Sequence, residues 1–172
     1  NRWDGLLLQK TLFKKNFERK PVSLLRFYLL WFFVIDKNFL MLLVNKIGIY
    51  CFYSASMLRE LAREIGNAKC LEIGAGDGTL TRFLKELGVD CRATDNYSWE
   101  NYIKYPEFVE KIEAKEALLK YRPETVICSW PPAGNAFEKN VFKTDSVTRY
   151  IVIGSSDPAV AGDHLAYREQ DQ

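Results

Sequence analysis

The chain has 172 residues, of which 48% are hydrophobic and 27% are charged, and its formal net charge is +2 at pH 7. These values are those of an ordinary globular domain with a hydrophobic core, and they exclude a chain that is too small or too polar to fold. The charge is uneven, because residues 1–50 contain nine Lys/Arg and three Asp/Glu whereas residues 51–172 contain fifteen and nineteen. A basic segment suits an anionic partner or a membrane surface, but we favour the simpler interpretation of helix faces solvated by lysine.

Residues 1–53 are rich in Leu, Phe, Trp and Lys and contain little glycine, so we expect an N-terminal helical extension. Two apolar runs, Val22–Ile35 and Phe39–Val44, are separated by Asp36–Asn38, which we interpret as a turn or helix cap. A membrane-spanning helix needs about 20 predominantly apolar residues, and charged residues interrupt this stretch. We therefore favour a buried or surface-docked helical hairpin, packed on the cofactor cleft or on one edge of the sheet. Membrane attachment and a dimer interface remain the alternatives.

Residues 54–172 alternate between helical and strand patterns and form the second expected domain. Strands separated by helices predict right-handed crossovers and a mostly parallel sheet, that is, a Rossmann-like doubly wound α/β fold. The polar segment after Gly154 is too short for another helix and a strand hairpin, so either the sheet ends early or the sequence is truncated. The expected helices cover residues 54–65, 79–87, 116–121 and 136–142, and the expected strands cover 69–73, 89–94, 125–128 and 149–153, with a short third strand within 107–113.

The four cysteines have neither metal-ligand nor CxxC spacing, and three of them fall in expected buried strands. We interpret them as reduced core thiols of a cytoplasmic protein and expect no metal site.

Residues 70–80 read CLEIGAGDGTL, an apolar strand that runs through a glycine-rich turn into a helix. Glycine permits positive φ and close ligand approach, and the first turn of the helix offers unpaired N–H groups. No Lys follows as in a phosphate-binding P-loop, and Thr79 stands where a dinucleotide fingerprint requires glycine. Glu72 would repel a pyrophosphate but can accept hydrogen bonds from an ammonium group. The turn therefore favours an aminoacyl nucleoside without phosphates.

Asp95 directly follows the second expected strand. A carboxylate at this position, beside the glycine turn, can accept hydrogen bonds from both hydroxyls of a ribose.

These residues resemble the class I S-adenosylmethionine-dependent methyltransferases, over about residues 50–154. Residues 71–78 look like the first motif of that family, and Asp95 looks like its ribose-binding acid. The resemblance implies S-adenosylmethionine (SAM) as cofactor, with Glu72 near its methionine end and Glu113, or the adjoining Ala114-Lys115, near its adenine. The implied cofactor-binding residues are Tyr53, Glu72, Gly74, Ala75, Gly76, Gly78, Asp95, Asn96, Glu113 and Ser129.

The fourth strand ends in Ser129-Trp130-Pro131-Pro132, a stiff turn that lacks proline N–H donors and leaves carbonyls available to a substrate. It resembles the (Asn/Asp)-Pro-Pro-(Tyr/Phe) turn of amino-group methyltransferases, but Trp130 and Ala133 replace the polar and aromatic residues. An indole N–H cannot accept a hydrogen bond from an amine, so nucleic-acid and protein amines are disfavoured as substrates. The turn also resembles a group of methyltransferase-like proteins with a Tyr-x-Phe-x-x-x-Ser segment, here residues 50–56, which implies Tyr53 or Ser54 near the cofactor carboxylate. We assign Ser129, Trp130 and Pro131 to the catalytic region.

We thus expect a SAM-dependent methyltransferase acting on a small-molecule acceptor. The alternatives are a SAM-binding or interaction protein without catalysis and, third, a nicotinamide oxidoreductase. Trp130 either packs on the sheet as a structural residue, or it lines the substrate site or makes a cation–π contact with the sulfonium. His164, in the polar tail, is expected at the surface.

Overall fold

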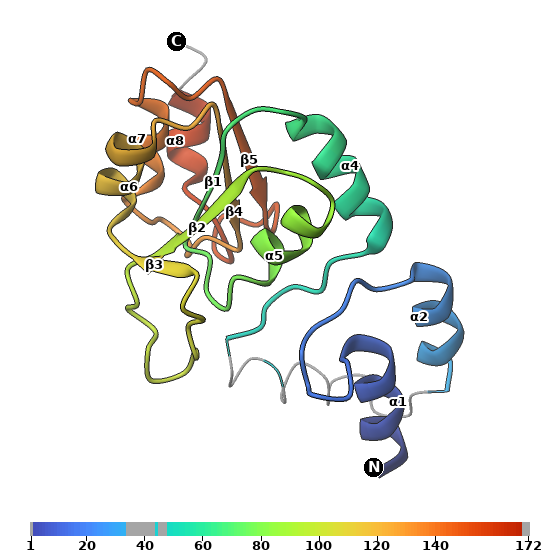
Figure 1. Cartoon of the computed structure of the whole chain (residues 1–172). Helices are drawn as coiled ribbons and strands as arrows, with labels where there is room; N and C mark the ends of the chain where they lie inside the picture. Colours follow the sequence, from blue (N-terminus) through green and yellow to red (C-terminus); the bar gives the residue numbers. More distant parts are fainter. Residues whose placement is uncertain (1, 34–43, 45–47, 170–172) are drawn as a thin grey trace. The chain divides into compact units, whose positions relative to one another are not determined.

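A computed structural model describes residues 2–33, 44 and 48–169 (Figure 1). It divides into two compact units, Asn1–Glu64 and Ile65–Gln172. The sequence suggested a division earlier in the chain, after Tyr53. The expected turn at residues 36–38 and most of the second apolar run lie outside the described residues.

The N-terminal unit contains helices α1 (Arg2–Leu12), α2 (Leu24–Trp31) and α4 (Ala55–Ile65). The Ser54 hydroxyl accepts a hydrogen bond from the Met57 N–H at 3.1 Å, so Ser54 is the N-cap of α4. A small core holds the unit together, and Arg19 lies buried within it, over the rings of Phe52 and Tyr53 at 5.5 and 5.2 Å. The core residues are Leu8, Leu12, Val22, Val44 and Ile49.

The second unit is built on a five-stranded, all-parallel sheet in the order β3-β2-β1-β4-β5. This arrangement confirms the α/β class and the parallel sheet expected from the sequence, including the short third strand. The strands are β1 (Cys70–Ile73), β2 (Cys91–Asp95), β3 (Val109–Lys111), β4 (Thr125–Ser129) and β5 (Arg149–Ile153), and the helices are α5 (Thr79–Glu86), α6 (Ala114–Tyr121), α7 (Glu138–Phe142) and α8 (His164–Glu169).

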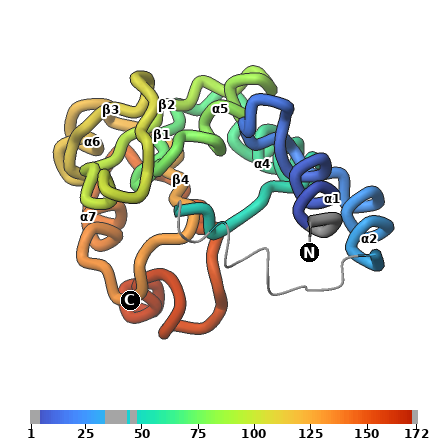
Figure 2. The backbone as a smooth tube through the Cα atoms, turned by 90° about the horizontal axis from the view of Figure 1, so that it is seen from below, coloured from blue at the N-terminus to red at the C-terminus, as the bar shows by residue number. Residues whose placement is uncertain are grey.

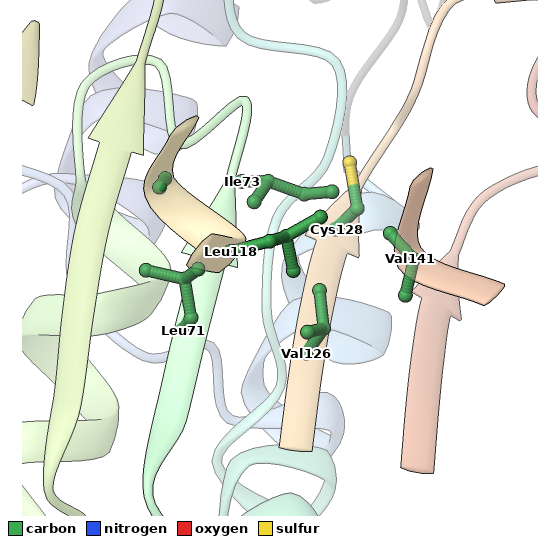
Figure 3. Close-up of a cluster of buried hydrophobic side chains, with 7 residues drawn as sticks. Leu71, Ile73, Leu118, Val126, Cys128 and Val141 are labelled. Carbon is green, nitrogen blue, oxygen red and sulfur yellow. The ribbon is translucent and has the colours of Figure 1, made fainter. Parts of the chain in front are cut away.

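Alternate residues of β1 pack against helices on opposite faces of the sheet. Leu71 and Ile73 belong to a buried cluster that reaches β4, α6 and α7, which Figure 3 shows with Leu118, Val126 and Val141. Glu72, on the other face, contacts Thr81 of α5. Figure 2 shows α6 and α7 on one side of the strands and α5 on the other.

The polar tail forms more structure than the sequence suggested. Short helix α8 follows a buried segment, Ala161–Asp163, whose Gly162 is hydrogen-bonded through its N–H to the Pro131 carbonyl at 2.9 Å. Backbone pairing between distant segments, which no local pattern encodes, orders this tail. Within the described residues the sheet ends at β5.

The cysteine prediction is confirmed for burial, since Cys70, Cys91 and Cys128 are buried and all four thiols are free. None of the described helices combines the length and apolar character that crossing a membrane requires.

Candidate functional site

The carboxyl ends of the five parallel strands meet at one edge of the sheet, and the strand order reverses there between β1 and β4. In open α/β sheets, ligands bind in the crevice beyond the carboxyl ends at such a reversal. Gly74 follows β1, Asp95 ends β2, Glu113 lies just past β3, and Ser129 ends β4. The sheet therefore gathers most of the site residues expected from the sequence at a single edge.

The glycine turn uses the freedom of glycine at each expected position. Gly74, Gly76 and Gly78 have φ of +63°, +55° and +66°, a region that side chains with a Cβ rarely adopt. At Gly78 packing adds a second requirement, because a Cβ there would lie 2.7 Å from the Phe108 ring. The third glycine is thus needed for the close approach of the β2–β3 loop as well as for its own backbone conformation.

Asp95 fastens the glycine turn to the end of β2. Its Oδ2 accepts a hydrogen bond from the Gly76 N–H at 2.9 Å, and its Oδ1 accepts one from the Tyr97 N–H at 2.8 Å. A carboxylate has about four acceptor sites, so each oxygen keeps capacity for a ligand hydroxyl. The Ala75 N–H, bonded to the Thr94 carbonyl at 3.0 Å, strengthens the same junction.

Glu72 caps helix α5 from the neighbouring strand. Gly78, the N-cap residue, has no side chain for this role, and Glu72 Oε2 accepts from the Thr81 N–H at 3.0 Å and the Thr81 hydroxyl at 2.5 Å. Asp77 Oδ1 accepts from the Thr79 N–H at 3.1 Å. Two carboxylates therefore satisfy N–H groups of the α5 N-terminus that an anionic ligand would otherwise use.

The Glu72 carboxyl is fully buried, and this burial raises its pKa from 4.5 to about 8. The charge of the nearby Cys91 thiol acts in the same direction, while the two hydrogen bonds from Thr81 oppose the rise in pKa. The side chain faces α5, so its contacts in the structure are those of a helix cap.

Two tyrosines of the β2–β3 loop lie beside Asp95, and sequence reasoning missed both. The Tyr97 and Tyr105 rings stack with centroids 3.8 Å apart and planes 7° apart, over Ala75, Ala93 and Val109. The Tyr105 hydroxyl is buried, and it interacts with the side chain of Asp95. Burial, and then the charge of Asp95, raise the Tyr105 pKa above its usual value. The high aromatic content of residues 97–108 is the sequence feature that could have indicated these two tyrosines.

Asn96 and Glu113 extend the edge toward β3. Asn96 Nδ2 donates to Glu113 Oε1 at 3.4 Å, and both side chains are exposed. The Ile112 N–H bonds to the Asp95 carbonyl at 3.0 Å, which holds the two strand ends together. These residues are available to a ligand lying between β2 and β3.

The end of β4 carries an unusual backbone. Trp130 has φ of +61°, which costs a residue with a Cβ about 1–2 kcal/mol, and its N–H donates to the Ile153 carbonyl at 2.6 Å. Cys128, two residues before Trp130 in β4, lies next to the glycine turn. A Cβ added at Gly74 would be 3.7 Å from the Cys128 Sγ. Trp130 and Ser129 are both half-buried.

The carbonyls of the Pro-Pro turn are engaged within the protein, contrary to the expectation that they are available to a substrate. The Pro131 carbonyl accepts from the Gly162 N–H at 2.9 Å, and the Pro132 carbonyl accepts from Asn135 Nδ2 at 2.9 Å. The tail that supplies Gly162 is distant in sequence, which is why the motif alone did not reveal this pairing.

A buried carboxylate, Glu138, also escaped the sequence reasoning. Its Oε1 accepts from the hydroxyls of Tyr150 and Tyr167 at 2.5 and 2.6 Å, and its Oε2 accepts from Asn135 Nδ2 at 2.5 Å and the Asp163 N–H at 2.7 Å. Four donors satisfy this charge, so Glu138 joins β5, α8 and the Pro-Pro turn as a structural anchor.

Tyr53 and His164 belong to other parts of the chain than the strand ends. Tyr53 belongs to the N-terminal unit, where Arg19 covers its ring. His164 begins α8 and lines a cavity of about 220 Å³ with Ser155 and Tyr167, and its Nε2 is buried without a partner among the described residues. The expectation of a surface histidine is thus corrected for this nitrogen, because α8 folds back onto β5. Among the residues that the structure describes, no His/Cys/Asp/Glu group is suited to hold a metal ion.

The chain was compared with protein-family models, curated proteins and solved structures. It matches none of them. The functional argument therefore rests on the geometry of the edge cluster.

Proposed function

We propose that this protein is a SAM-dependent methyltransferase with a Rossmann-like doubly wound core, acting on a small-molecule acceptor. The sheet order corresponds to the first five strands of the order 3-2-1-4-5-6 that typifies that fold. The observation that carries the proposal is the Asp95 carboxylate bonded to the Gly76 N–H, because it sets a ribose-type acid directly at the glycine turn. Bound SAM would supply a methyl group made electrophilic by its sulfonium.

The residues present suit such a cofactor. The positive-φ turn lets a ligand approach the backbone closely, and Asp95 retains acceptor capacity for two ribose hydroxyls. The buried Tyr105 hydroxyl, which interacts with Asp95, adds a second polar group beside the carboxylate that would bind the ribose. Asn96 and Glu113 provide polar groups toward the β3 side.

The α5 N-terminus favours SAM over a nicotinamide dinucleotide. A pyrophosphate needs free N–H groups and positive potential at this helix end. Glu72 and Asp77 already occupy the Thr81 and Thr79 N–H groups. We therefore place the nicotinamide oxidoreductase last.

A titration with S-adenosylhomocysteine (SAH), in parallel with NAD, tests the proposal. A ligand at 100-fold its Kd adds about 2.7 kcal/mol to the free energy of unfolding, so we expect SAH to raise the Tm by about 5 °C or more. NAD should leave the Tm unchanged. Stabilisation by NAD alone would refute the proposal.

SAM binding without catalysis is the second candidate, and the engaged Pro131 and Pro132 carbonyls favour it. In this candidate, the internal hydrogen bonds reduce the acceptor capacity of both carbonyls for an amine substrate. Incubation with methyl-labelled SAM and a metabolite extract separates the two candidates. SAH binding without label transfer would favour the second.

A further inference from the structure

The N-terminal unit exposes an apolar surface that its own core does not use. Nine of the sixteen large hydrophobic side chains exposed among the described residues lie in residues 1–64. The densest group belongs to α2 and the turn after it. We define the α2 face as Leu25, Tyr28, Leu29, Phe32 and Phe33, which are 73, 68, 60, 84 and 66% exposed.

The α2 face is one side of a helix in which Arg26 is the only charged residue. Its members recur at the i, i+3, i+4, i+7 and i+8 positions that share a helix side. Phe27 and Trp31, on another side of the helix, stack with centroids 5.2 Å apart and pack against the core of the N-terminal unit. No residue of α2 itself is buried. One apolar side of the helix therefore packs on the core of the N-terminal unit, while a second apolar side is exposed to solvent.

An exposed group of this size marks an interaction surface in a folded protein. Leu, Phe and Tyr side chains on a short helix suit the boundary between lipid headgroups and acyl chains, where the tyrosine hydroxyl stays hydrated. At 1.5 Å per residue the eight residues of α2 extend about 12 Å, far short of the roughly 30 Å hydrocarbon core. This helix suits the plane of a membrane surface.

The positive net charge of the N-terminal segment favours anionic over neutral lipids. Residues 1–50 contain nine Lys/Arg and three Asp/Glu, and Lys14, Lys15 and Arg26 are exposed. Phe17, at the end of the loop that carries both lysines, is exposed with φ of +61°. Basic side chains flanking apolar ones complement anionic headgroups.

We propose that the α2 face docks the protein on a membrane surface that contains anionic lipid. Docking inserts Leu25, Phe32 and Phe33 among the acyl chains, while the basic side chains contact the headgroups. This inference is independent of the proposed methyltransferase function.

Co-sedimentation of the full chain with lipid vesicles tests the proposal. We expect binding to vesicles of phosphatidylcholine and phosphatidylserine, weaker binding to phosphatidylcholine alone, and weakening by salt. Phe32→Asp and Phe33→Asp should each lower the partition coefficient about tenfold or more, since each removes a large apolar side chain from lipid. The double variant Lys14→Glu/Lys15→Glu should weaken binding only to the anionic vesicles.

Leu119→Asp is the matched control, because Leu119 of α6 is 65% exposed in the other unit. It should leave vesicle binding unchanged, and circular dichroism should show all variants folded. The proposal would be overturned if the protein bound neither kind of vesicle. It would also be overturned if Leu119→Asp lowered vesicle binding as much as Phe32→Asp and Phe33→Asp do. A dimer in gel filtration that Phe33→Asp abolishes would also overturn it, since a second copy would then cover the face.

Discussion

Three carboxyl groups at or beside the β1–α5 turn have different roles, which follow from their hydrogen-bond partners. Glu72 and Asp77 accept from backbone N–H groups of α5 and so belong to the helix N-terminus. Asp95 accepts from the turn and from the residue after β2, with lone pairs left over. Only Asp95 is thus placed to hold a neutral polyhydroxyl ligand.

If Asp95 binds the ribose as proposed, Asp95→Ala should weaken SAH binding more than tenfold, because it removes this acceptor and the hydrogen bond to the Gly76 N–H. Calorimetry measures this directly. Asp90→Ala, at the residue just before the opposite end of β2, is the control and should bind SAH normally. Unchanged affinity in Asp95→Ala would remove the ribose assignment.

Glu72 should make stability depend on pH. Because the folded pKa is about 8 and the ordinary value is 4.5, the folded protein keeps a proton that the unfolded chain releases. The contribution of this proton is complete below pH 4.5 and is lost as pH rises through about 8, with a slope of at most about 1.4 kcal/mol per pH unit. Glu72→Gln should flatten urea-derived unfolding free energies across this window. An unchanged slope would contradict the raised pKa.

At the scale of elements, the end of the β2–β3 loop packs directly against the N-terminus of α5. Gly78 is the N-cap of α5, and the Phe108 and Val109 side chains lie where its Cβ would be, at 2.7 and 2.8 Å. The loop thereby closes one side of the glycine turn.

Gly78→Ala should lower the free energy of unfolding by about 2–5 kcal/mol, the sum of the left-handed backbone cost and overpacking. Gly134→Ala tests the backbone cost alone, since Gly134 has a similar φ of +62° and open space around its Cβ. It should cost about 1–2 kcal/mol. Denaturant unfolding of both variants would show whether the difference between them is real, and equal losses would refute the packing argument.

The end of β4 offers a second test at this scale. Trp130→Asn keeps a residue that tolerates positive φ but removes the indole. We expect the free energy of unfolding to change by less than about 1 kcal/mol, because relief of backbone strain offsets the lost burial. Methyl transfer should fall at least tenfold if the indole forms the floor of the substrate site. A loss of about 3 kcal/mol would instead identify Trp130 as a core wall residue.

For the whole molecule, burial predicts unequal local stability. β1 and β4 are buried along nearly their entire length, whereas α2 has no buried residue. Hydrogen exchange followed by mass spectrometry should therefore show the slowest amides in β1 and β4 and fast exchange in α2. Added SAH should slow exchange in residues 74–78 and 95–97. Equal protection of α2 and β1 would contradict this prediction.

The sequence by itself determined the α/β class, the approximate positions of the five strands and the placement of Gly74–Gly78 and Asp95 near strand ends. Hydrophobic runs broken by glycine turns are local signals, and parallel strands bring their carboxyl ends to one edge. Only the tertiary structure decided what those residues touch. Glu72 became the cap of α5, Tyr105 came to lie beside Asp95, and the distant Gly162 took the Pro131 carbonyl. These pairings join segments far apart in the chain, and their geometry depends on packing that no local pattern encodes.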